Sequence, residues 1–112
     1  MLRNQIKESD WKIFKELRPL ALDRYCKRVM EDVEKTIHQS NKDSHTRYIE
    51  MYKTVKEGDK KLAQMFDGYS RSKAVEQLLL YYSNDLLTDE EFARLSDETR
   101  EQILSILEIM RG

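Results

Sequence analysis

The segment from Ser44 to Tyr82 constrains the fold of this chain more than any other. It contains no proline, and its apolar and aromatic residues recur at helical spacing: Tyr48, Tyr52, Val55, Leu62, Phe66 and Tyr69. One continuous helix of this length would extend for roughly 58 Å, whereas a compact chain of this size has a diameter of about 34 Å. We therefore expect either a break in the helix or a partner that covers its apolar stripe.

The phase of the apolar residues places that break near Gly68. At about 100° per residue, the stripe up to Tyr69 shares one face, but the apolar residues that follow lie on the opposite face: Val75, Leu78, Leu79 and Tyr82. Gly68 suits the left-handed position that ends a helix, and Ser70 can cap a new one. The sequence predicts one long central helix over about residues 44–82, kinked or broken near Gly68. The alternative is a straight helix whose two halves pack on different bodies, as in many dimers.

Composition limits the chain to a small helical domain. Its 112 residues include three glycines and one proline, which leaves few turns for a large antiparallel sheet or for long loops. Charged residues of both signs make up 37% of the chain, yet the apolar periodicity persists through them, as on a solvated helical surface. We expect a single all-α domain over residues 1–112, a bundle of four to six helices, with residues 1–8 as a candidate flexible segment.

Capping residues mark the boundaries of the amino-terminal helix. Ser9 and Asp10 are expected to open it, and Pro19 to kink it or to start a fresh helix. The amphipathic stretch that follows should end near His38. A polar turn over residues 39–43 should then make the central helix run back antiparallel to the first.

Two further helix starts follow the central segment. Thr88 and Glu91 form a capping box, and Ser96 precedes two acids that favour the first turn of a last helix. That helix is apolar on most of its circumference, with Ile103, Leu104, Ile106, Leu107, Ile109 and Met110. Such a helix is buried in its own core or in a second subunit.

The sequence contains no readable motif for catalysis or for a cofactor. It lacks a glycine-rich phosphate loop, a nucleophile elbow and a paired-carboxylate pattern. His38 and His45 are expected to be solvated, and Cys26 to be a buried inert thiol. Residues 84–92 resemble the second half of an EF-hand loop, but with Glu91 as the last ligand too few oxygens remain. We expect no enzyme activity, no cofactor and no metal.

Charge and hydropathy limit the partners and the location. The candidate basic face comprises Lys53, Lys56, Lys60 and Lys61, but acids interrupt it and the pI is about 6.1, so the sequence favours a protein partner over a nucleic-acid partner. The first residues lack the apolar run of a signal peptide, and no stretch approaches the length that spans a bilayer. We expect a cytoplasmic protein without membrane contact.

The tyrosines of the central stripe favour an interface, because a tyrosine suits a surface that is dry on one side and polar on the other. We predict a soluble interaction or accessory protein that acts as a homodimer and can present a helical face to a protein partner. The candidate interface residues are Tyr48, Tyr52, Val55, Leu62, Phe66, Tyr69, Ile103, Leu107 and Met110. The alternatives are a weak nucleic-acid-binding accessory protein that uses the basic face, and an enzyme or small-molecule binder with a pocket between helices.

Overall fold

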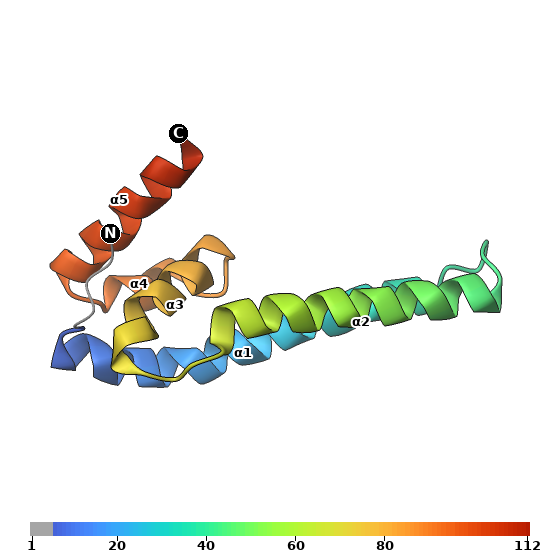
Figure 1. The fold of residues 1–112 in the computed structure, drawn as a ribbon, viewed down its shortest axis with the longest axis horizontal. Coiled ribbons are helices and arrows are strands. Elements are labelled where there is room, and N and C mark those ends of the chain that lie inside the picture. Colours follow the sequence, from blue (N-terminus) through green and yellow to red (C-terminus); the bar gives the residue numbers. More distant parts are fainter. Residues whose placement is uncertain (1–5) are drawn as a thin grey trace. The chain divides into compact units, whose positions relative to one another are not determined.

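A computed structural model describes residues 6–112, and within that range the chain forms five α-helices and no β-strand (Figure 1). The helices are α1 (Glu8–Ile37), α2 (Ser44–Phe66), α3 (Arg71–Ser83), α4 (Asp89–Ala93) and α5 (Asp97–Arg111). The predicted all-α class with four to six helices is confirmed. The expectation of a flexible segment over residues 1–8 falls mostly on residues outside the described range.

The predicted break in the central segment is confirmed. α2 ends at Phe66, and Gly68 has a φ of 83°, in the left-handed region that a residue without a Cβ adopts at low cost. The N–H of Asp67 donates to the carbonyl of Ala63 and closes the last turn of α2. α3 then begins at Arg71. The longest described helix is therefore α1 rather than the central one.

Pro19 does not start a fresh helix, so that alternative was wrong. α1 runs through it as one helix of 30 residues. The proline removes only the hydrogen bond from its own nitrogen to the carbonyl of Lys15. Both residues are exposed, so water can satisfy that carbonyl.

Contacts divide the chain into two units. The first unit comprises the described residues up to Leu22 together with Gly68–Gly112, and the second comprises Asp23–Asp67. The first unit thus contains the start of α1 with α3, α4 and α5, and the second contains the rest of α1 with α2. This division does not test the single-domain prediction, which stays a prediction.

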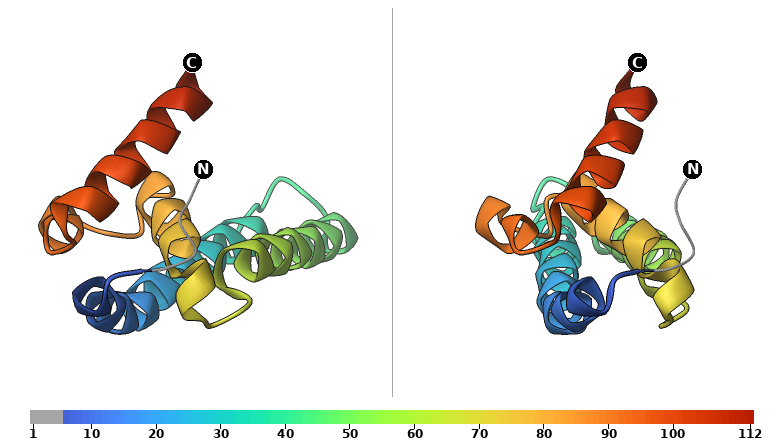
Figure 2. Two further views of the ribbon diagram at one scale, coloured as in Figure 1. Left: turned by 60° about the vertical axis from the view of Figure 1, so that its left-hand side comes forward. Right: turned by 90° about the vertical axis from the view of Figure 1, so that its left-hand side faces the viewer.

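The first unit holds most of the buried apolar side chains. α3 packs against α5 (Figure 2). The largest fully buried apolar and aromatic side chains come from α1, α3, α5 and the α3–α4 connection: Phe14, Leu17, Leu78, Tyr81, Leu86 and Ile103. The hydroxyl of Tyr81 donates to Oε1 of Gln77 at 3.0 Å, and Nε2 of Gln77 donates to the carbonyl of Gly68 at 2.8 Å. Burial raises the pKa of Tyr81 well above its ordinary value.

Asp10 fastens the start of α5 to α1. Its side chain is fully buried, and its carboxylate accepts hydrogen bonds from the Ser96 N–H at 2.7 Å, the Ser96 hydroxyl at 2.7 Å and the Thr99 hydroxyl at 2.8 Å. A negative charge at this position also suits the amino terminus of a helix. The sequence predicted that Asp10 opens α1, but α1 already begins at Glu8. The side chain of Asp10 instead holds the start of α5.

Candidate functional site: an apolar face of the helical hairpin

Residues 23–67, hereafter the hairpin, are two antiparallel helices joined by a short polar connection (Figure 1). Asp43 caps α2 by accepting a hydrogen bond from the Thr46 N–H at 2.8 Å. Across the connection, Arg47 donates to the carbonyl of Ile37 at 2.8 Å. These local bonds fix the reversal of the chain, which the polar composition of residues 39–43 had predicted.

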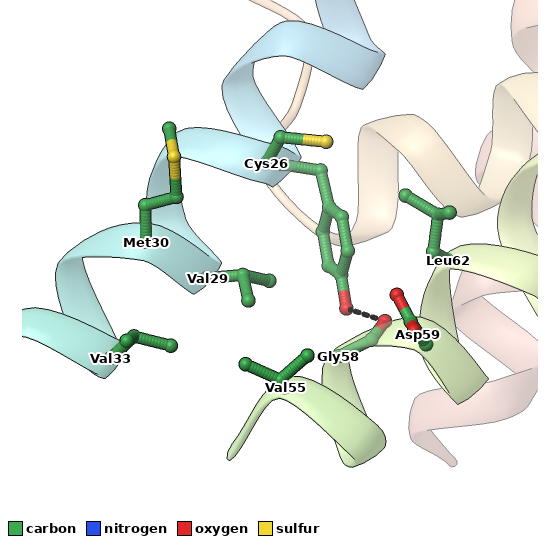
Figure 3. Close-up of a pocket in the computed structure, with 9 residues that line it drawn as sticks. Cys26, Val29, Met30, Val33, Val55, Gly58, Asp59 and Leu62 are labelled. Carbon is green, nitrogen blue, oxygen red and sulfur yellow. Dashed lines mark hydrogen bonds between the residues drawn. The ribbon is translucent and has the colours of Figure 1, made fainter. Parts of the chain in front are cut away.

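The two helices of the hairpin approach closely at Gly58. A Cβ added there would lie 3.0 Å and 3.1 Å from the two methyl carbons of Val29, so a side chain would crowd the neighbouring helix. The hydroxyl of Tyr25 donates to the carbonyl of Gly58 at 2.8 Å (Figure 3). Burial, with added repulsion from Cys26 and Asp59, raises the pKa of Tyr25 and keeps it neutral.

The hairpin buries few side chains. Within residues 23–67, all of which the structure describes, only Tyr25, Gly58, Met65 and Phe66 are buried. Two packed helices have a single contact line, so side chains on either flank of that line stay open to water. A unit of this size gains little stability from so small a core without a further partner.

Apolar side chains gather on one flank of the hairpin. We define the open face as nine residues: Cys26, Met30, Val33 and Ile37 from α1, and Tyr48, Tyr52, Val55, Asp59 and Leu62 from α2. Its middle is a groove of about 350 Å³, in which the two helices supply opposite walls (Figure 3). By helical phase, the other flank of the hairpin is charged, with Arg28, Lys35, Glu50, Glu57 and Lys61.

The largest side chains of the open face are substantially exposed. Tyr48 is 65% exposed, Tyr52 is 53% exposed and Met30 is 62% exposed. Two shallower hollows adjoin the groove along α2, and both are lined by Tyr48, Tyr52 and Lys56. Aromatic rings bordered by lysine stems are typical of the rim and anchor positions of protein interfaces.

The structure separates the predicted interface residues into different environments. Tyr48, Tyr52, Val55 and Leu62 lie together on the open face. Phe66 is buried, with its ring centroid 6.5 Å from that of Tyr25. The break at Gly68 therefore ends the open face before the stripe predicted from the sequence does.

The remaining predicted interface residues belong to the first unit. Tyr69 is 54% exposed, and its ring packs 5.5 Å from the ring of Trp11, centroid to centroid. Ile103 and Leu107 are buried in the core, whereas Met110 is exposed near the end of α5. None of these residues is part of the open face.

The four predicted basic residues are all exposed on α2. By helical phase, Lys53, Lys56 and Lys60 lie beside the open face, whereas Lys61 lies on the opposite flank. Lys56 lines both hollows at Tyr48 and Tyr52. The lysines are therefore arranged as a border of the apolar face rather than as a continuous strip of four.

Sequence reasoning did not include the α1 half of the open face or Asp59 among the candidate site residues. The available signal was the spacing of four and three residues on both helices, from Cys26 to Ile37 and from Tyr48 to Leu62, which is typical of coiled-coil seams. In α1 this spacing is masked by Tyr25 and Val29, which lie on the neighbouring face and contact α2.

The described part of the chain offers no metal site: no group of three or more histidine, cysteine or acidic side chains in residues 6–112 is arranged to hold an ion. Among the same residues, no helix has both the length and the hydropathy that crossing a membrane requires.

Comparison with protein-family models, with curated proteins and with solved structures finds no match to this chain.

Proposed function

We propose that this chain is an interaction protein that acts as a homodimer, and that the open face of the hairpin is the dimer interface. The observation that carries the proposal is the contiguous apolar flank of a two-helix unit that buries only four of its residues. Exposed apolar side chains on this scale are typical of interaction surfaces, because they gain free energy when water is excluded from them.

A second hairpin suits this face better than a small ligand does. The groove volume lies near the lower limit for small-molecule sites, and a single charged group, Asp59, lines it. A small ligand would leave the exposed rings of Tyr48 and Tyr52 in water. A second copy brings two helices to a face that is itself two helices wide, and so completes a four-helix bundle.

The proposal is tested by placing a charge in the open face. Tyr52→Glu should convert the dimer to a monomer in size-exclusion chromatography with light scattering, because the carboxylate would be buried against apolar side chains. Gln64→Glu is the matched control, since it adds the same charge to an exposed position outside the open face of α2. If Tyr52→Glu remains a dimer like the parent protein, the open face is not the dimer interface.

The nucleic-acid alternative is supported by the alignment of Lys53, Lys56 and Lys60 on one side of α2. It predicts that the chain shifts the fluorescence anisotropy of a labelled oligonucleotide, with affinity that falls steeply as salt increases. Absence of any shift at low salt excludes this alternative and leaves the dimer proposal unaffected.

A further inference from the structure

The open face contains a charge where its pattern requires an apolar side chain. Along α2 the face follows the residues 48, 52, 55, 59 and 62, with alternating steps of four and three. That spacing defines a seam between packed helices, and one polar residue in such a seam selects the orientation and register of the partner. Asp59 occupies that place between Val55 and Leu62, and all three line the groove.

The carboxylate of Asp59 has no partner within the described chain. It makes no hydrogen bond and no ion pair with residues 6–112, and it is exposed at the wall of the groove (Figure 3). In the proposed homodimer, on which this inference rests, a second hairpin would remove water from this carboxylate. A buried carboxylate is tolerated only where a donor or a cation compensates it.

The dimensions of the open face fit a second copy. The two helices share about 22 Å of length, the rise of residues 23–37, and together are about 20 Å wide, so the face covers on the order of 450 Å² on each copy. Two such faces approach the area of the smaller specific protein interfaces. A face that binds its own copy must also carry both the donor and the acceptor of every polar pair. The open face carries the hydroxyl donors of Tyr48 and Tyr52 and the carboxylate acceptor of Asp59.

The two possible orientations treat Asp59 differently. If the two hairpins run parallel, Asp59 lies in the same layer as Asp59 of the partner subunit, and two like charges meet in an apolar layer. If they run antiparallel about a twofold axis near Val55, the middle of α2, each Asp59 lies at the level of residues 51 and 52 of the other copy. The hydroxyl of Tyr52 is then a hydrogen-bond donor at the level of the carboxylate.

We propose that the two hairpins pack antiparallel in the dimer, and that Asp59 of each copy accepts a hydrogen bond from Tyr52 of the partner subunit. Asp59 thereby excludes the parallel arrangement, in which its charge would face its own copy. The pair occurs twice by symmetry, as an isologous interface requires.

A distance between the two connections of the hairpins distinguishes the orientations. A spin label is attached to Asn41→Cys in a Cys26→Ser background, after light scattering has shown that this chain remains a dimer. Antiparallel packing places the two labels at least about 33 Å apart, which is twice the rise of α2 from Val55 to Ser44, whereas parallel packing places them within about 20 Å. The proposal predicts a single distribution at the long distance in pulsed dipolar spectroscopy.

The role of Asp59 is tested with Asp59→Leu in the same labelled chain. Leucine should lower the dissociation constant of the dimer about tenfold, because no carboxylate is then buried in the interface. It should also add a short-distance population, because the charge that excludes parallel packing is gone. Glu57→Leu, on the charged flank of α2, is the control and should change neither quantity.

Each result of these measurements decides a different point. A short distance in the parent dimer overturns the antiparallel assignment but leaves the homodimer in place. An Asp59→Leu chain with an unchanged dissociation constant and only the long distance overturns the role of Asp59. A parent chain that is monomeric removes both the inference and the proposed function on which it rests.

Discussion

Replacing Asp10 should destabilise this protein far more than replacing a carboxylate that is exposed on the same helix. The side chain of Asp10 is fully buried, and it accepts three hydrogen bonds of 2.7 to 2.8 Å from Ser96 and Thr99. In Asp10→Ala the Ser96 N–H and the two hydroxyls lose their acceptor. The substitution also removes a negative charge from the amino terminus of α5.

The magnitude follows from the number and type of these bonds. A hydrogen bond to a charged acceptor contributes about 1.5–3 kcal/mol, but the three share one carboxylate and Ser96 is only partly buried, so their sum is an upper bound. We expect Asp10→Ala to lower the free energy of unfolding by about 3–5 kcal/mol, a large share of the roughly 5–15 kcal/mol of a small domain. Asp10→Asn should cost about half as much, since the amide keeps one acceptor and the hydroxyls can rotate to accept from its NH₂.

The assay is urea unfolding followed by far-UV circular dichroism at one fixed protein concentration, because dimerisation would couple to stability. Glu16→Ala is the control, since Glu16 lies on the same helix and makes an exposed ion pair with Arg94 at 2.7 Å. It should cost less than about 1 kcal/mol. If Asp10→Ala costs no more than Glu16→Ala, the three hydrogen bonds do not hold α5 to α1 as described.

Two further predictions concern the hairpin and the core of the first unit. Gly58→Ala should destabilise the chain by about 1–2 kcal/mol despite the better helix propensity of alanine, because the new Cβ meets both methyl groups of Val29. The same change in a Val29→Ala background should be neutral or stabilising. Urea unfolding of the parent, the two single variants and the double variant measures the coupling between the two positions. Because burial raises the pKa of Tyr81, its neutral form contributes stability that is complete below about pH 10 and is lost as the pH rises further. The free energy of unfolding should therefore fall less steeply above pH 10 in Tyr81→Phe than in the parent. Equal slopes of the two proteins would contradict this assignment.

Features encoded by neighbouring residues were predicted from the sequence. The break at Gly68, the capping box of Thr88 with Glu91 and the start of α5 after Ser96 each depend on residues within a few positions of one another. Helical phase also placed Tyr48 and Tyr52 on a common apolar stripe, and the structure shows both on the open face.

Features that depend on distant residues were not predicted. Asp10 looked like a helix cap, but its hydrogen-bond donors are 86 and 89 positions away, and local pattern carries no information about them. The stripe was also expected to continue to Tyr69, since periodicity alone does not show that the chain leaves one unit for another at Gly68. Asp59 was not among the predicted site residues, because the sequence alone did not pair the α1 wall of the groove with it.

The mass of the unmodified chain in solution shows whether two hairpins associate through their open faces. Sedimentation equilibrium over a range of micromolar concentrations should fit a reversible association of two 13.5 kDa chains, driven by burial of the open faces. A mass that stays at one chain across that whole range would refute the homodimer, because the apolar flank of the hairpin would then remain in water.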